Sequence, residues 1–124
     1  MSGYNFEIKG IDNFLKDINN IQSSFHSDLQ NLVEKHGGIL LRNTKIKSPV
    51  DTGQLRRSWQ LEKGDLYVKL YNNVEYAQFV EFGHRTRGGK SYVEGVYMLK
   101  TSFEKTKKDF ENDLEKLLKK YGFK

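Results

Sequence analysis

The sequence predicts an α+β fold, with a small, mainly antiparallel β-sheet packed by a long N-terminal helical segment and a C-terminal helix. Apolar residues recur every three or four positions between residues 11 and 40, and again after residue 98, as on one face of a helix. Between these segments, apolar residues alternate on both sides of Lys63-Gly64-Asp65, which is the pattern of a β-hairpin. The 124 residues are the length of one domain, so we expect residues 1–124 to form a single domain.

The first predicted element is a short β-strand at residues 4–8. Tyr4, Phe6 and Ile8 alternate with polar residues, which is the period of a strand with one buried face. Gly10 then breaks the pattern, so we expect the strand to end before it.

A long helical segment is predicted from residue 11 onward. Asn19-Asn20 and Gly37-Gly38 are weak helix formers inside it, and a glycine costs about 1 kcal/mol relative to alanine. The segment is therefore either two helices or one helix that is locally less stable at these positions. Pro49 disfavours helical backbone at Ser48, so we expect the segment to end there.

The middle of the chain is predicted to form a hairpin with strands at residues 57–61 and 66–71. Leu66, Val68 and Leu70 would share one face of the second strand, and Asn72-Asn73 would form a further turn. Residues 74–82 fit both a helical turn and a strand. We favour a short helix or an irregular segment beside the sheet.

Residues 83–95 are predicted to be a flexible, projecting arm within the domain. The segment is rich in glycine and basic residues, and a connection of this length in a compact domain is either functional or mobile.

After the arm, a C-terminal helix is predicted from residue 98 onward. One face of this helix carries the apolar residues Leu99, Phe103, Phe110, Leu114, Leu117 and Tyr121.

Composition restricts the classes of function only loosely. The net charge of +5 and the pI near 9.3 permit contact with nucleic acid, but a lysine-rich surface also serves solubility alone. The absence of cysteine excludes disulfides, thiolate metal sites and cysteine nucleophiles. Neither a secretory signal nor the roughly 18–20 apolar residues of a membrane span is visible, so we expect synthesis in the cytoplasm and no membrane contact.

Sequence motifs of catalysis are missing. His26, His36 and His84 lack the i, i+4 spacing of metal ligands on a helix, and no phosphate-binding loop, dinucleotide fingerprint or nucleophile elbow occurs. Asp51 and Glu81 are the best acid pair for general acid–base work. Asp51 is better explained by an Asx-type turn, and Glu81 by a pairing with a basic residue. We therefore expect no enzyme, no bound metal and no cofactor.

The most informative stretch is residues 48–59, which read SPVDTGQLRRSW. Pro49 stops the helix, the polar residues that follow can hydrogen-bond a turn, and Gly53 allows a positive φ. Leu55 would anchor the chain to the core, while Arg56 and Arg57 would face outward.

Two later segments complete a pattern, YAQFVEFG at residues 76–83 and GVYML at residues 95–99. In this order the segments resemble the tail-completion, or head–tail joining, proteins of tailed bacteriophages, the family named for gene product ten of phage HK97. The resemblance runs from the first predicted strand to the last helix. Its two departures are His84, where the family usually has a small hydroxyl residue, and Gly37-Gly38. The matching positions, which we interpret mostly as framework for the hairpin and the base of the arm, are Pro49, Val50, Asp51, Thr52, Gly53, Leu55, Arg56, Ser58, Tyr76, Ala77, Val80, Glu81, Phe82, Gly83, Met98 and Leu99.

The resemblance implies a non-enzymatic structural protein at the head–tail interface of the virion. Such subunits form a ring, typically of six, and the free protein could be a monomer before assembly. The implied partners are copies of itself, the head-closure protein and the tail terminator or tail tube protein, with incidental contact to packaged DNA. A tail-terminator or other minor tail role is the alternative. On the same resemblance, we expect Glu81 to pair with Arg56.

A ring subunit must present two unlike surfaces, because each copy meets a different patch of the next. The arm is the candidate for one of them, through Arg85, Arg87, Lys90 and Tyr92. We expect it to become ordered on contact with its partner. The alternative from another class of function is a basic nucleic-acid-binding module. The same four residues would contribute to it, and its binding would weaken steeply as the salt concentration rises.

Overall fold

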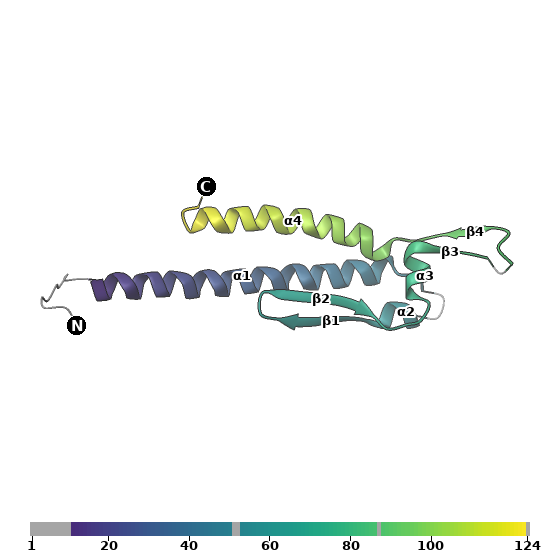
Figure 1. Ribbon diagram of the computed structural model, residues 1–124, viewed down its shortest axis with the longest axis horizontal. Helices are drawn as coiled ribbons and strands as arrows, with labels where there is room; N and C mark the ends of the chain where they lie inside the picture. The colour runs from purple at the N-terminus through teal and green to yellow at the C-terminus, as the bar shows by residue number, and fades with distance from the viewer. Residues whose placement is uncertain (1–10, 51–52, 87, 124) are drawn as a thin grey trace, which may run out of the picture.

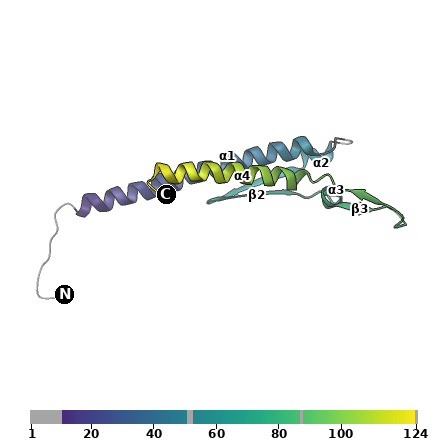
Figure 2. The ribbon, with the colours of Figure 1, turned by 90° about the horizontal axis from the view of Figure 1, so that it is seen from above.

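The computed structural model describes residues 11–50, 53–86 and 88–123, with side chains from residue 16 onward. The predicted α+β class is confirmed, although the strands form two separate two-stranded antiparallel sheets. The molecule is elongated: α1 and α4 lie side by side, one hairpin packs on α1, and the other projects from one end (Figures 1 and 2). The strand predicted at residues 4–8 lies outside the described residues. The elements in order are α1 Ile11–Lys47, α2 Gln54–Arg57, β1 Trp59–Gly64, β2 Tyr67–Asn72, α3 Ala77–Phe82, β3 Gly83–Arg85, β4 Tyr92–Glu94 and α4 Met98–Lys120.

Helix α1 is one continuous helix of 37 residues. Neither Asn19-Asn20 nor Gly37-Gly38 interrupts it, so the alternative of two helices is wrong. At Gly37-Gly38 tertiary packing outweighs the weak propensity, because β1, β2 and α4 all pack on this helix and Val68 of β2 approaches Gly37 itself. The helix ends at Lys47, two residues before Pro49, as predicted.

The first hairpin pairs β1 with β2 in a register that places Leu61 opposite Leu70. The strands begin and end one to three residues later than predicted. Val68 and Leu70 are half-buried against α1, but Leu66 lies in the turn, with a positive φ of 59° and 37% of its surface exposed. The prediction that Leu66 shares the buried face was therefore wrong, because the turn falls one residue later than Lys63-Gly64-Asp65 suggested.

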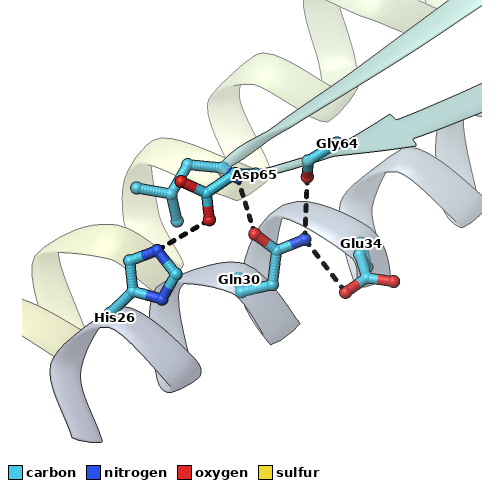
Figure 3. Close-up of polar contacts among 6 residues, drawn as sticks. His26, Gln30, Glu34, Gly64 and Asp65 are labelled. Atoms are coloured by element: carbon cyan, nitrogen blue, oxygen red, sulfur yellow. Dashed lines mark hydrogen bonds and ion pairs between the residues drawn. The ribbon is translucent and has the colours of Figure 1, made fainter. Parts of the chain in front are cut away.

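Polar contacts hold the tip of this hairpin to α1 (Figure 3). The Gln30 amide donates to the Gly64 carbonyl at 3.0 Å, and its oxygen accepts the Leu66 N–H at 2.6 Å. Gln30 also donates to Glu34, and His26 Nε2 lies 2.8 Å from Asp65 Oδ1. Because one side chain satisfies two backbone groups of the turn, the distance between the hairpin and the helix is fixed at the turn.

The hydrophobic core sits where the C-terminal end of α1 meets the other elements. Leu55, Trp59 and Met98 form its buried centre, each no more than 6% exposed. Ser48 connects α1, β1 and α4 around this centre. Its hydroxyl donates to the Thr44 carbonyl at 2.7 Å and accepts the indole N–H of Trp59 at 2.8 Å. The same oxygen lies 3.2 Å from the Met98 sulfur. The half-buried residues packed on this centre are Leu41, Leu70, Val74, Ala77, Val80 and Leu99.

Helix α4 follows the predicted C-terminal helix from residue 98 and runs along α1 (Figure 1). Polar contacts supplement its apolar face. His36 Nε2 lies 2.8 Å from Asp113 Oδ2 in the middle of the interface, and the Tyr121 hydroxyl donates to Asp28 at 2.7 Å near its end. Phe103 is 53% exposed, so this residue of the predicted apolar face is not covered by α1.

These two carboxylates predict acid sensitivity of the α1–α4 interface. The hydrogen bond from Tyr121, together with Lys120, lowers the pKa of Asp28, and the hydrogen bond from His36, with Lys35, lowers the pKa of Asp113. A carboxyl whose folded-state pKa is lowered stabilises the fold above its unfolded pKa of about 3.9 and loses that contribution as the pH falls through the folded value. We expect Asp28→Asn and Asp113→Asn to flatten the decline of urea stability between about pH 5 and pH 2. An unchanged slope in both variants would contradict this origin.

Candidate assembly surface

The segment that follows α1 closes that helix with an arginine. Arg56 Nη2 donates to the carbonyls of Ile46 and Ser48 at 3.0 and 3.1 Å, so it satisfies groups that the end of α1 leaves unpaired. Arg56 is therefore half-buried, and the prediction that it faces outward was wrong, whereas Arg57 is exposed as predicted. Gly53 has the predicted positive φ, at 72°, and Leu55 is buried in the core.

Glu81 is buried and caps α4. Its two carboxylate oxygens accept the N–H groups of Leu99 at 2.9 Å and Lys100 at 2.8 Å. Tyr97, the residue before the helix, provides no side-chain cap, and no acidic residue lies in the first turn. The expected Glu81–Arg56 pair is therefore wrong. Arg56 instead satisfies carbonyl groups at the end of α1, and Glu81 satisfies N–H groups at the start of α4. The unpaired backbone groups at a helix end attract a charged side chain of the matching sign, as an opposite charge would.

The base of the arm is tied to α3 by a close backbone crossing. The N–H groups of Val96 and Tyr97 donate to the carbonyls of Val80 and Glu81 at 2.8 and 3.0 Å. A Cβ on Gly95 would lie 2.3 Å from the Glu81 carbonyl oxygen, so only glycine permits this approach. The base of the arm and the start of α4 are therefore held against α3.

The arm itself is a β-hairpin that projects beyond the body of the molecule (Figure 1). β3 pairs with β4, with His84 opposite Val93, and beyond them the Thr86 N–H donates to the Ser91 carbonyl at 2.8 Å. The Tyr92 hydroxyl donates to the Phe82 carbonyl at 2.6 Å. The predicted projection is confirmed, and the structure adds a regular hairpin; its flexibility in solution stays a prediction.

Apolar side chains gather where the arm meets α3. We call this set the arm-base patch. Its members are between 46% and 60% exposed: Phe79, Phe82, Tyr92, Val93 and Val96. The aromatic rings of Phe79 and Phe82 touch those of His84 and Tyr97, with centroids 6.0 and 6.5 Å apart. Only Phe82 and Tyr92 of this set were among the predicted site residues.

The other predicted site residues divide between framework and surface. Ala77, Val80 and Leu99 pack on the core, and Met98 is fully buried. Ser58 ends α2 and Gly83 begins β3 with a φ of 86°. Pro49 is half-buried, and the exposed members are Val50, Tyr76, Arg85 and Lys90. Asp51, Thr52 and Arg87, with the predicted Asx-type turn, lie outside the described residues.

Other kinds of site have little support in the described part of the chain. There, no three histidine, aspartate or glutamate side chains are grouped so that they could hold a metal ion. No helix of residues 11–50, 53–86 and 88–123 is both long and apolar enough to cross a membrane.

Comparison with known proteins identifies one family. The family described as "Bacteriophage HK97-gp10, putative tail-component" matches residues 12–83, which run from the first turn of α1 to the start of β3. The match includes Arg56 with the end of α1 that it caps, and it includes Glu81, but the start of α4 that Glu81 caps lies beyond the matched residues. Neither the curated proteins nor the solved structures contain a match to this chain.

Proposed function

Because the chain belongs to the HK97-gp10-like family of bacteriophage tail components, we propose that it is a tail-completion or head–tail joining subunit that forms a ring in the neck of the virion. Its partners would be copies of itself, the head-closure protein, and the tail terminator or tail tube protein. The role is structural, so we propose no reaction, metal or cofactor.

The observation that carries this proposal is the arm-base patch. A group of large apolar side chains that remains exposed on a small protein is typical of a surface that another protein covers. The patch sits at one end of an elongated subunit, where Glu81 and the crossing at Gly95 tie α3 to the start of α4 and to the base of the arm. An apolar end suits the head-to-tail contact of a closed ring, in which each copy meets a different surface of the next.

We expect Phe82→Asp to abolish assembly while leaving the fold intact. Phe82 is 60% exposed, so a carboxylate there costs the monomer little but would be desolvated in an apolar interface. The measurement is the mass of the protein by light scattering, alone and mixed with tail tubes and head-closure protein from the same genome. The unmodified protein should give a ring, or a monomer that becomes a ring on tails, and the variant should stay monomeric in both.

Ile21→Asp is the matched control, because Ile21 is 54% exposed in the N-terminal part of α1. The arm projects from the opposite end of the molecule (Figure 1). If both variants lose assembly, the arm-base patch is not the specific contact. If the unmodified protein remains a monomer in every mixture, the neck proposal itself is wrong. Binding to tail tubes without head-closure protein would favour the tail-terminator role instead.

A nucleic-acid-binding module is the second candidate, and the exposed Arg85 and Lys90 on the projecting arm favour it. Phosphate contacts would make such binding weaken steeply as salt rises. Binding to duplex DNA that disappears with added salt, in a protein with no affinity for phage proteins, would support this candidate over ring assembly.

A further inference from the structure

An apolar groove lies open between β2 and α4. Two adjoining cavities of about 220 and 390 Å³ share Leu40, Val68 and Phe103, one from each of the three surrounding elements. The floor is the face of α1 that carries Val33, Gly37 and Leu40, and Phe103 stands 53% exposed at the opposite wall. A groove of this composition would bury apolar side chains if a further element entered it.

The free edge of β2 borders this groove. β2 pairs with β1 along one side, and in the part of the chain that the structure describes this sheet has only these two strands. The groove is lined by β2 and α4 but by no residue of β1, so it lies on the unpaired side of β2. An edge strand beside an apolar trough is a template for one more strand.

The sequence offers a segment suited to that position, residues 4–8, where Tyr4, Phe6 and Ile8 alternate with polar residues. If Glu7 lies opposite Lys69 in an antiparallel pair, Phe6 and Ile8 fall opposite Leu70 and Val68, on the face that β2 turns toward the groove. The outward face then has Glu7 beside Lys69, which already has Glu62 as its neighbour on β1. Apolar and charged positions therefore match in this register.

A chain cannot place this segment in its own groove. Helix α1 rises about 1.5 Å per residue, so Ile11 lies roughly 33 Å from Val33, the nearest floor residue of the groove. Residues 4–11, even when fully extended, span no more than about 25 Å. Figure 1 also shows that the N-terminal end of α1 extends beyond the end of α4, so α1 carries the segment away from its own groove and toward a neighbour.

We propose that residues 4–8 of one copy pair with the free edge of β2 in the next copy and close its groove. The inference rests on the proposed self-assembly and assigns to it a second, unlike contact. The N-terminal end of α1, to which the segment is joined, lies at one end of the described subunit and the groove lies further along the same helix, so the contact is heterologous, as a ring requires.

Cysteine cross-linking of the full chain tests the contact, since the protein has no cysteine of its own. A tagged Glu7→Cys variant is mixed with a Lys69→Cys variant under assembly conditions and mildly oxidised. Directly opposite residues of an antiparallel pair have Cβ atoms about 4.5–5.5 Å apart, so a small adjustment brings them within the roughly 3.5–4.5 Å that a disulfide needs. The matched control is Glu62→Cys on β1, one strand or about 4.8 Å further away. We expect a disulfide-linked heterodimer with Lys69→Cys and at least tenfold less with Glu62→Cys.

Light scattering on the same samples separates this inference from the proposed function. If rings form but neither pair cross-links, or Glu62→Cys links as well as Lys69→Cys, strand exchange onto β2 is wrong and ring assembly stands. If the double variant Glu7→Cys with Lys69→Cys cross-links only within a monomer, the reach argument is wrong. If no assembly forms, both proposals fall.

Discussion

Replacing Glu81 with alanine should lower the free energy of unfolding by about 2–4 kcal/mol, although Glu81 forms no ion pair within the described residues. Its carboxylate accepts two backbone N–H groups of the first turn of α4, at 2.9 and 2.8 Å, and the side chain is only 6% exposed. Removing it leaves two donors without a partner in a site with little access to water, and it removes a negative charge from the positive end of the helix dipole. Urea denaturation followed by circular dichroism measures the loss.

The conservative variant Glu81→Gln separates capping from packing. The amide keeps the size of the side chain and one acceptor oxygen, but its NH₂ group would face a backbone donor. We expect it to lose about 1–3 kcal/mol. Glu75→Ala is the control, because Glu75 is exposed just before α3 and should change stability by less than about 0.5 kcal/mol. A loss in Glu75→Ala equal to that in Glu81→Ala would show that the effect does not come from the cap.

The sequence predicted the class of fold and most elements because their periodicity is local. The apolar spacing of α4, the hairpin and the stop at Pro49 all depend on neighbours within a few residues. What the sequence did not predict depends on residues distant along the chain. Arg56 and Glu81 were both singled out, but their partners are helix ends, and no local pattern says which backbone group a side chain will reach.

The arm-base patch was predicted only in part, and a signal for one further member, Phe79, was available. Ala77, Val80 and Glu81 point inward from the short helix α3, so Phe79 and Phe82 must lie on its other side. A helical projection of residues 77–82 would have identified two exposed aromatic residues. Val93 and Val96 carried no such signal, because their exposure depends on how the hairpin leaves the body.

The adjacent glycines of α1 should respond to alanine in opposite directions. A Cβ on Gly37 would lie 2.8 and 3.0 Å from the two methyl carbons of Val68 and 3.1 Å from its Cβ, whereas a Cβ on Gly38 would meet nothing within 4 Å. Val68 is β-branched and stiff, so it cannot turn aside and β2 would have to shift. We expect Gly37→Ala to lower the free energy of unfolding by about 1–2 kcal/mol through overpacking. Gly38→Ala should raise it by about 0.5–1 kcal/mol through helix propensity alone.

The two variants Gly37→Ala and Gly38→Ala also test why α1 is continuous. If both variants were stabilised equally, Gly37 would be a plain helix position and the close approach of β2 to α1 would be wrong. If Gly37→Ala is destabilised as expected, the helix gives up propensity at one residue so that Val68 can approach its axis and form a wall of the groove. In the double variant Gly37→Ala with Val68→Ala, the smaller side chain at residue 68 makes space for the new Cβ at residue 37. The double variant should then lose less free energy of unfolding than the sum of the two single variants, which a double-mutant cycle in urea measures directly.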